Sequence, residues 1–335
     1  MPKMTIKDVA KLADVSPSAV SFVINNKKGV SPETRDKVLK IIEQVGYIPN
    51  PNSRRLIFNK SNNFVVLFKR SISPLEHYFY AEINNVILHE CENYGYNLIF
   101  ASIIVEDNKI EFPDVVKSYD VDGIIFYGDV DPIILRSLQK YAIPYIIIDS
   151  HSPNPDTLSV VADYSVAAYT AVKYLIQSGH ENIAYIGNSF LAGFSAQTFS
   201  GYKKAMGESN LASDMQWIQL ESQDEISAGY CMENILSCKN FPTAVFCSAD
   251  IYAIGAIRAI KNAGLRVPDD ISIISIDDII LSRYTDPMLT TIKIDKKEMG
   301  RIAINLLLKK IQDESVENAV IESDKLIVRG STKII

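Results

Sequence analysis

Residues 5–21 read TIKDVAKLADVSPSAVS, and this stretch decides the fold of the first part of the chain. Thr5 and Ser16 stand where helices can start, since a hydroxyl oxygen there accepts a bond from an otherwise unpaired backbone N–H. Thr5 and Asp8 have the spacing of a capping box with the shorter acid. Apolar residues then recur at helical spacing and form one face: Ile6, Val9, Ala10 and Ala13. The sequence therefore predicts an amphipathic first helix with a core to pack against.

Two more helices follow in the same compact segment. The second is predicted from Ser16 to Asn25 and the third from Pro32 toward Val45, with Gly46 able to close it in the left-handed conformation. In the second helix the residues expected to face inward are Ala19, Val20, Val23 and Ile24. The residues left to face outward are Pro17, Ser18, Ser21 and Phe22. The third carries apolar residues at Val38, Leu39, Ile41 and Ile42. Short uncharged side chains on the second helix are thus left to meet a partner.

Charge divides the chain at the same place. Residues 1–60 hold 11 lysines and arginines against five aspartates and glutamates, whereas the remaining residues hold 23 against 35. A local basic excess attracts a phosphate backbone and makes the affinity depend on salt. A small helical cap with a solvated basic face would have the same charge, so the residue pattern has to decide between a DNA-binding head and such a cap.

The pattern of the head resembles the helix-turn-helix of the LacI/GalR family of bacterial transcription regulators. The matching segments are residues 5–25, VSPETR at 30–35, and GY-x-PN at 46–50 through Arg54 and Leu56. The resemblance implies that the second helix enters the major groove of double-stranded operator DNA. The DNA-contacting residues that it implies in this head are Thr5, Ser16, Pro17, Ser18, Ser21, Phe22 and Asn25. The family often has arginine at Phe22; phenylalanine instead offers apolar surface to a thymine methyl group.

Residues 47–60 are predicted to form a linker with one short helix. Pro49 and Pro51 disfavour helix before them, and so short a helix needs a partner to be stable. By resemblance to the family's hinge helix, Leu56 would wedge between base steps in the minor groove, and Arg54 and Arg55 would contact phosphates. The alternative is a plain interdomain linker with incidental arginines.

From Asn63 onward, apolar runs alternate with helix-like segments, as in parallel sheets covered by helices on both faces. About 275 residues exceed one comfortable core, so two α/β lobes are expected. The predicted strands are Phe64–Phe68, Leu98–Ile104, Gly123–Phe126, Tyr145–Ile148, Ile183–Ile186, Ala244–Cys247 and Ile271–Ile276.

The resemblance extends over almost the whole chain and implies a fold similar to periplasmic binding proteins. Matching landmarks include VDGII at 121–125, PTAVF at 242–246 and LIVR at 326–329. The domains expected are an all-α helix-turn-helix head (1–46), a hinge helix and linker (47–62), and a two-lobed α/β effector-binding and dimerisation domain (63–335). The N-lobe would comprise about 63–160 and 290–321, and the C-lobe about 161–289 and 322–335. Three crossings, near 161, 289 and 322, would leave a ligand cleft between the lobes, at the carboxyl ends of the strands.

Residues at or after the strand ends are the candidates for effector binding. Asp149, Asp250 and Asp277 follow predicted strands, and Phe79 and Tyr80 lie in the loop after the first strand. Each aspartate could equally cap a helix, and the aromatic pair could equally pack in the core; Asp277 also falls where the family has its cleft aspartate. The family's sugar-gripping arginine aligns with residues 196–198, which hold no arginine, and Ala249 replaces its cleft asparagine. A standard sugar is therefore not expected.

Other chemistry is not indicated. The four cysteines lie in or near apolar runs without zinc or disulfide spacing, and the four histidines stand apart, so no metal site is expected. No phosphate-binding glycine loop or nucleophile elbow occurs, so neither a cofactor nor an enzyme activity is expected. No stretch approaches 18 apolar residues, and the N-terminus lacks an apolar signal core.

The sequence thus favours a cytoplasmic, DNA-binding transcription regulator, a repressor, controlled by a small-molecule effector of unknown identity. A homodimer is expected, because the last ten residues contain no heptad pattern for a tetramerising tail. The alternative is a solute-binding protein of a transporter, which would share the two lobes. Such a protein would have no use for the basic head, and we therefore disfavour it.

Overall fold

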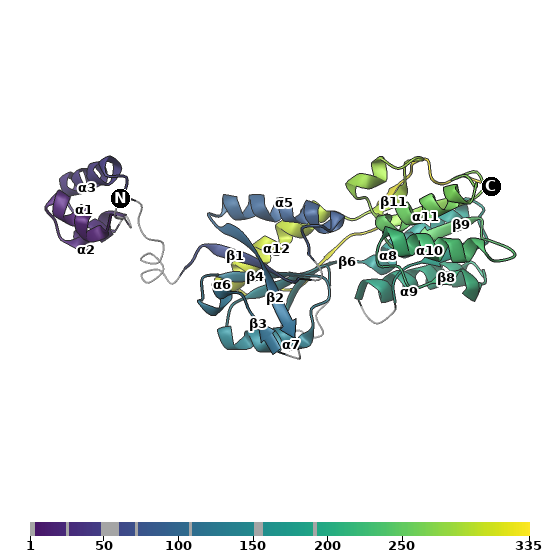
Figure 1. Ribbon diagram of the computed structural model, residues 1–335, viewed down its shortest axis with the longest axis horizontal. Coiled ribbons are helices and arrows are strands. Elements are labelled where there is room, and N and C mark those ends of the chain that lie inside the picture. Colours follow the sequence, from purple (N-terminus) through teal and green to yellow (C-terminus); the bar gives the residue numbers. More distant parts are fainter. Residues whose placement is uncertain are drawn as a thin grey trace.

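The computed structural model describes residues 4–24, 27–47, 60–70, 73–106, 109–150, 157–189 and 193–335. Figure 1 shows three packed bodies along the chain: a helical head, a first α/β lobe and a second α/β lobe. The fold class expected from the sequence is confirmed for the head and the two lobes. Residues 48–59, which contain the expected hinge helix, lie outside the described residues.

The head contains α1 (Ile6–Ala13), α2 (Pro17–Ile24) and α3 (Pro32–Gln44). The capping box forms at α1, where the Thr5 hydroxyl accepts from the Asp8 N–H and the Asp8 carboxylate accepts from the Thr5 N–H. Gly46 takes the left-handed conformation that the sequence predicts, with φ of 59°. The head core gathers apolar residues of all three helices, including Val9, Ala10, Ala13, Val20, Val23 and Val38. Leu39, expected on the apolar side of α3, is instead 48% exposed.

The first lobe is built on a sheet of strand order β12-β6-β5-β4-β1-β2-β3. Its pairs are parallel except β2 with β3, and parallel neighbours need crossover connections, for which helices such as α5, between β1 and β2, serve here. The strands are β1 (Asn63–Lys69), β2 (Asn97–Glu106), β3 (Lys109–Glu111), β4 (Gly123–Tyr127), β5 (Tyr145–Ile148), β6 (Leu158–Ala162) and β12 (Ala319–Ile321). The helical segments are α5 (Tyr78–Asn93), α6 (Asp114–Lys117), α7 (Pro132–Leu138), η1 (Gln139–Tyr141) and α12 (Lys296–Ile311).

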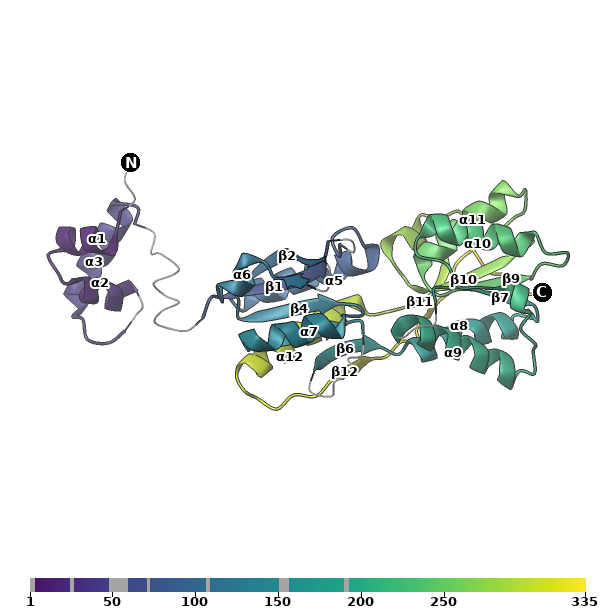
Figure 2. The same ribbon diagram turned by 60° about the horizontal axis from the view of Figure 1, so that its bottom comes forward.

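The second lobe has a sheet of order β13-β11-β10-β9-β7-β8. In Figure 2, α10 and α11 lie on one side of this sheet and α8 and α9 on the other, which buries its strands on both faces. The strands are β7 (Ile183–Ile186), β8 (Ile218–Gln219), β9 (Ala244–Cys247), β10 (Ser272–Asp277), β11 (Thr290–Lys293) and β13 (Leu326–Ile327). The helical segments are α8 (Tyr164–Gln177), α9 (Gly193–Glu208), η2 (Met215–Trp217), α10 (Glu225–Leu236), α11 (Asp250–Asn262) and η3 (Ile280–Arg283).

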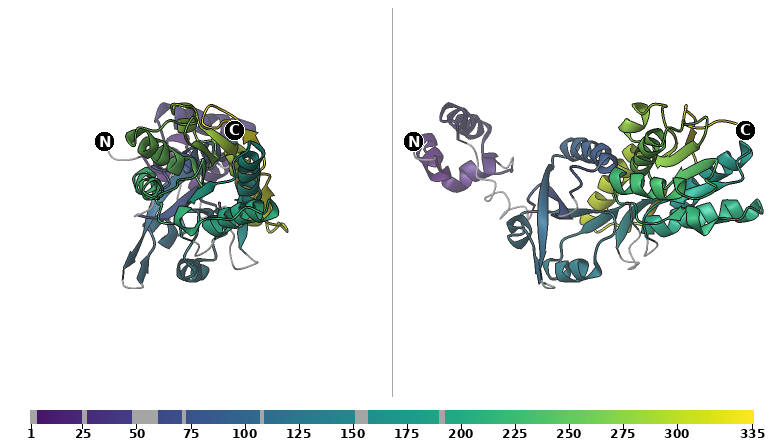
Figure 3. Two further views of the ribbon diagram at one scale, coloured as in Figure 1. Left: turned by 90° about the vertical axis from the view of Figure 1, so that its right-hand side faces the viewer. Right: turned by 45° about the vertical axis from the view of Figure 1, so that its right-hand side comes forward.

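The chain passes between the lobes after Ala162, after Lys293 and after Ile321. The lobe boundary expected near 289 is wrong, because β11 at 290–293 pairs in parallel with β10 of the second lobe. Its buried threonines extend the second sheet before the chain returns to α12 of the first lobe. Figure 3 shows the C-terminus at the end of the second lobe that points away from the first.

All seven predicted strands form, as β1, β2, β4, β5, β7, β9 and β10. The strands that the sequence missed are short or partly polar, and most lie at the edges of the sheets or beside a crossing. β6 of the first lobe and β11 of the second, for example, each lie immediately before a point where the chain passes into the other lobe.

Candidate effector cleft and DNA-binding head

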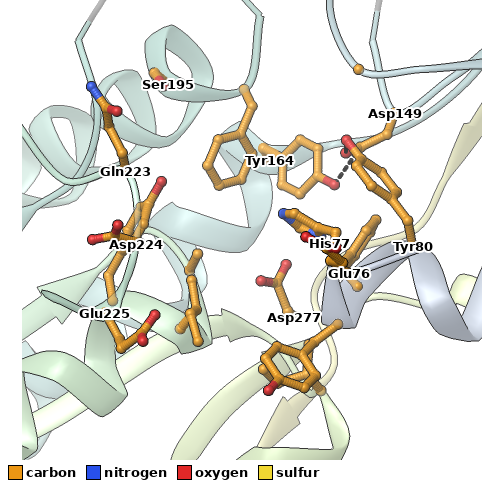
Figure 4. Close-up of a pocket in the computed structure, with 18 of the residues that line it drawn as sticks. Glu76, His77, Tyr80, Asp149, Tyr164, Ser195, Gln223, Asp224, Glu225 and Asp277 are labelled. Atoms are coloured by element: carbon orange, nitrogen blue, oxygen red, sulfur yellow. Dashed lines mark hydrogen bonds between the residues drawn. The ribbon is translucent and has the colours of Figure 1, made fainter. Parts of the chain in front are cut away.

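A cavity of about 390 Å³ lies between the two lobes. Both lobes line it from the carboxyl ends of their strands, where open α/β sheets bind ligands. Figure 4 shows side chains from both sides converging on this space. The first lobe contributes Glu76, His77, Tyr78, Phe79, Tyr80, Gly128, Asp129 and Asp149. The second contributes Tyr164, Phe194, Ser195, Gln223, Asp224, Glu225, Ala249, Ile251, Tyr252, Asp277 and Ile279.

Asp149, directly after β5, connects the two lobes across the cleft. Its carboxylate accepts a hydrogen bond of 2.9 Å from the Tyr80 hydroxyl of the first lobe and another from the Tyr164 hydroxyl of the second. Burial raises the pKa of Asp149 to about 6, and the two hydroxyl donors limit the rise by favouring the charged form. Asp149 is thus a buried carboxyl whose partners change if the lobes move apart.

Asp277 ends β10 and points into the cavity (Figure 4). Its side chain is buried and its φ is 122°, a conformation that L residues rarely adopt. Burial raises the pKa of Asp277 well above its usual value, and the neighbouring Asp250 carboxylate raises it further. Asp277 therefore holds its carboxyl group at the cavity wall at an energetic cost.

Asp250 has a different place from the one expected. It is absent from the cavity lining, and its carboxylate accepts bonds of 2.6 Å from Ser275, 2.6 Å from Thr291 and 2.9 Å from the Ile279 N–H. These donors come from β10, β11 and the segment after β10, so Asp250 ties the start of α11 to two strands. This placement corrects the expectation of an effector contact, since the carboxylate is already saturated with internal donors. It is not a helix cap either, because Ala249 occupies the N-cap position of α11.

Phe79 and Tyr80, predicted from the sequence to lie in the loop after the first strand, lie instead in the first turn of α5, and both line the cavity. The Phe79 ring meets Tyr80 edge-on at 5.5 Å between ring centroids, and Tyr80 stacks on Tyr127 at 4.6 Å. Phe79 is only 3% exposed and also belongs to the first-lobe core. Phe79 therefore both lines the cavity and packs in the core.

Lys296, which the sequence pattern does not single out, fastens the lobes together behind the cavity. It is the first residue of α12 and is 3% exposed. Its ammonium donates to the backbone carbonyl oxygens of Asp277 at 2.5 Å and Asp278 at 3.2 Å, and it lies 5.5 Å from the Phe79 ring centroid. No motif marks this lysine, because its role depends on a contact between the returning helix and a strand end 19 residues earlier.

Several other lining residues were not predicted either. Tyr164, Phe194 and Tyr252 lie on helices of the second lobe, and Asp224 is the N-cap of α10. Asp129 of the first lobe lies so close to Gly193 that a Cβ there would come within 2.8 Å of its carboxylate. The one sequence signal available was their position shortly after strands or at helix starts.

The predicted DNA-contacting residues that the structure describes lie on α2 or at its start, except Thr5, which caps α1. Thr5, Ser16, Pro17, Ser18 and Phe22 are exposed, and Ser21 is half-buried. The Ser16 hydroxyl accepts a bond of 3.1 Å from the Ala19 N–H, so it also caps the helix. Asn25, Arg54, Arg55 and Leu56 lie outside the described residues.

The geometry defines a class of protein: a two-lobed domain with a cavity between the lobes, carrying a helix-turn-helix head. Among the described helices, none combines the length and apolarity needed to span a membrane. Family models match in two places, to bacterial regulatory proteins of the lacI family at residues 5–50 and to a periplasmic binding protein-like domain at residues 172–332.

Whole-length relatives agree with these matches. The HTH-type transcriptional repressor PurR of Histophilus somni (strain 129Pt) is 36% identical, over 98% of this chain and 99% of the relative. A solved structure of the Lac repressor dimer bound to operator and the anti-inducer ONPF is similar with a TM-score of 0.85 and 24% identity, over 99% of both chains. The transcription regulator CcpA of Lactococcus lactis is similar with a TM-score of 0.70 and 28% identity, over 81% of this chain and 99% of that one. The chain belongs to the lacI family and is a DNA-binding transcription regulator.

Proposed function

We propose that the protein is a homodimeric, cytoplasmic repressor whose affinity for operator DNA is set by a small molecule bound between the lobes. The observation that carries the proposal is a cavity lined by both lobes, which are joined through Asp149 and Lys296. A ligand there contacts both lobes at once, so its binding free energy depends on how far they are closed. Closure is then coupled to any function that depends on lobe geometry.

The DNA contacts are proposed to come from α2 and the hinge segment. Pro17 and Ser18 at the start of α2, and Phe22 farther along it, are exposed and would reach base edges, while Thr5, Ser16, Ser21 and Asn25 would fix the helix in the major groove. Arg54 and Arg55 would contact phosphates beside the Leu56 wedge. The relative from Histophilus somni is a transcriptional repressor, which supports repression as the output.

A dimer is supported by exposed apolar side chains on helices of both lobes. Leu88 on α5 is 44% exposed, and Ile226 and Tyr230 on α10 are 50% and 62% exposed. Apolar side chains in such surface positions are typical of protein interfaces when they form a patch. The Lac repressor, whose fold is the same, is a dimer in its operator-bound structure. Two heads on a two-fold axis would read a pseudo-palindromic operator.

The proposal is tested by a gel shift on DNA from upstream of the protein's own gene. The full chain is compared with a fragment of residues 63–335, and a coding-sequence DNA of equal length serves as the control. We expect the full chain to prefer the upstream DNA by at least roughly 10³-fold, with an affinity that falls steeply as salt increases. A fragment that still shifts the upstream DNA, while melting as the intact lobes do, would overturn the proposal.

A further inference from the structure

Three buried carboxylates meet where β10 ends, and they differ in how they are satisfied. Asp250 accepts three hydrogen bonds, and Asp278 pairs with Arg329 at 2.5 Å and with Arg283 at 3.6 Å. Asp277, only 8% exposed, has no hydroxyl, amide or guanidinium donor to its carboxylate among the described residues; its ionised form is favoured by the charge of Lys296 and by the Asp250 backbone N–H. A buried carboxylate left with so little compensation is costly, and Asp277 faces the cavity (Figure 4).

The rest of the cavity lining has the same sign of charge. Among the described residues, the lining contains neither lysine nor arginine, and five more carboxyl side chains line it: Glu76, Asp129, Asp149, Asp224 and Glu225. Lys296 lies nearby, but its ammonium donates to backbone carbonyl oxygens at the Asp277 end of β10. Burial lowers the pKa of His77, so the imidazole is neutral at pH 7. The ionised carboxylates of the described lining would therefore repel an anionic ligand.

Aromatic rings form the remaining walls. Phe79 and Tyr80 line the cavity from the first lobe, and Tyr164, Phe194 and Tyr252 from the second. Tyr164 meets Phe194 edge-on at 4.6 Å, which fixes both rings at the cavity edge. Aromatic faces attract cations through their quadrupole, and they also stack on flat rings. A metal ion would gain nothing from these walls, whereas an organic cation would use both them and the carboxylates.

On the basis of the proposed function, which makes this cavity the effector site, we propose that the effector is an organic cation, a protonated amine carried on a flat or apolar frame. Asp277 pairs with the ammonium group, and Tyr252 and Phe194 cover the frame. The segment from Ser195 to Phe199, at the start of α9, supplies no positive charge. Its Thr198 is buried and bonded to the Tyr185 hydroxyl at 3.0 Å.

Proton linkage supports the same assignment. The pKa of Asp149, faced by Tyr80, Tyr164 and Asp129, is raised to about 6 by burial. The pKa of Asp277, faced by Asp250, Lys296 and Asp149, is raised well above its usual value, also by burial first. A bound cation favours the ionised forms of both groups, so binding releases protons. The affinity for a cation should therefore rise as the pH increases from about 5 to about 8.

The test uses matched compounds on the full chain. Each set has an amine, an alcohol and a carboxylate on one frame: phenethylamine, 2-phenylethanol and phenylacetate; tryptamine, tryptophol and indole-3-acetate; cyclohexylmethylamine, cyclohexylmethanol and cyclohexanecarboxylate. Binding is measured by thermal shift and then by calorimetry. We expect at least one amine to bind tenfold or more tightly than its alcohol, and no carboxylate to bind. Equal or tighter binding of a neutral or anionic member, or no binding of any amine, would overturn the proposal.

Variants test whether the amine binds in this cavity. Asp277→Asn should weaken the best amine at least tenfold, while Asp324→Asn, which removes an exposed charge outside the cavity, should leave it unchanged. Tyr252→Leu provides a second cavity variant and should weaken the amine more than the alcohol. An amine that binds all three variants equally would overturn the assignment.

Binding of upstream DNA by the ligand-free wild-type chain is measured alongside. Retained DNA binding with no amine response rejects the cationic effector and leaves the regulator intact. Absence of DNA binding rejects the proposed function itself.

Discussion

The head and the cleft are two sites of one chain that are built in opposite ways. The head forms from about 40 consecutive residues, with each helix start capped by a residue within three positions of it. The cleft gathers side chains from Glu76 to Ile279, which meet only when two sheets are complete. The charges are opposite too, since the head is basic and the cavity lining is acidic. Contacts between neighbours in sequence therefore specify the head, where DNA binding is proposed, and long-range topology specifies the cleft, where effector binding is proposed.

The largest expected effect comes from a residue of the second lobe that makes long-range contacts. Asp250→Ala leaves the Ser275 and Thr291 hydroxyls and the Ile279 N–H without their acceptor in a buried site. We expect the free energy of unfolding of the lobes to fall by about 3 kcal/mol or more. Urea unfolding followed by circular dichroism measures it, and Asp324→Asn serves as the exposed control. A loss below about 1 kcal/mol would show that Asp250 does not organise the second lobe.

Particular residues show why the sequence was informative for one region and not for the other. Thr5, Asp8 and Gly46 could be assigned because caps and left-handed turns depend on neighbours in sequence. The seven strands were predictable because a buried parallel strand is continuously apolar. Asp149, Asp250 and Asp277 all follow or end strands, so sequence position alone could not tell a cavity carboxylate from one saturated by internal donors. Lys296 and Tyr164 depend on the lobe crossings, and the crossing after Lys293 was itself misplaced in the prediction.

The next prediction concerns the proposed hinge helix and its effect on operator affinity. Leu56→Ala removes the proposed wedge that would hold the DNA in its bent form, so operator affinity should fall by about 2 kcal/mol. Affinity for random DNA should change little, because phosphate contacts do not depend on the wedge. Fluorescence anisotropy on both DNAs measures the difference. Equal losses on the two DNAs would favour a plain linker.

Lys296→Met tests the connection between the lobes. The substitution keeps the aliphatic volume but removes the donor to the Asp277 and Asp278 carbonyl oxygens. We expect a loss of about 1–2 kcal/mol in the free energy of unfolding. Lys297→Met is the matched control, since Lys297 is the next residue of α12 and is exposed. Equal melting temperatures for the two variants would contradict the bridging role.

Thr5→Ala tests whether the head is stabilised by local contacts alone. It removes the capping box of α1 and should destabilise the head by about 1 kcal/mol. The lobes, which share no core with the head, should melt unchanged. Differential scanning calorimetry separates the two transitions. A shift of the lobe transition as large as that of the head would argue against independent folding.

The smallest expected effect is a pH slope that arises from the cleft. Carboxyl groups with raised pKa values bind protons in the folded state, so their contribution to stability is greatest at low pH and falls as the pH rises. Asp149 and Asp250, each with a pKa raised to about 6 by burial, contribute between about pH 4 and that pKa. Above pH 6 the remaining slope belongs to Asp277, at less than roughly 1 kcal/mol per pH unit. Melting curves from about pH 6 to about pH 8 should show that Asp277→Asn flattens this slope; an unchanged slope would place its origin elsewhere.

The most direct test of the account is reciprocal coupling between the two sites. The dissociation constant for the operator is measured with and without a saturating compound that stabilises the lobes, and that of the compound with and without operator. The account predicts the same factor in both directions, on the order of 5–150-fold, because coupling free energies are reciprocal. A compound that fills the cleft while leaving operator affinity unchanged would contradict the claim that the acidic cleft controls the basic head.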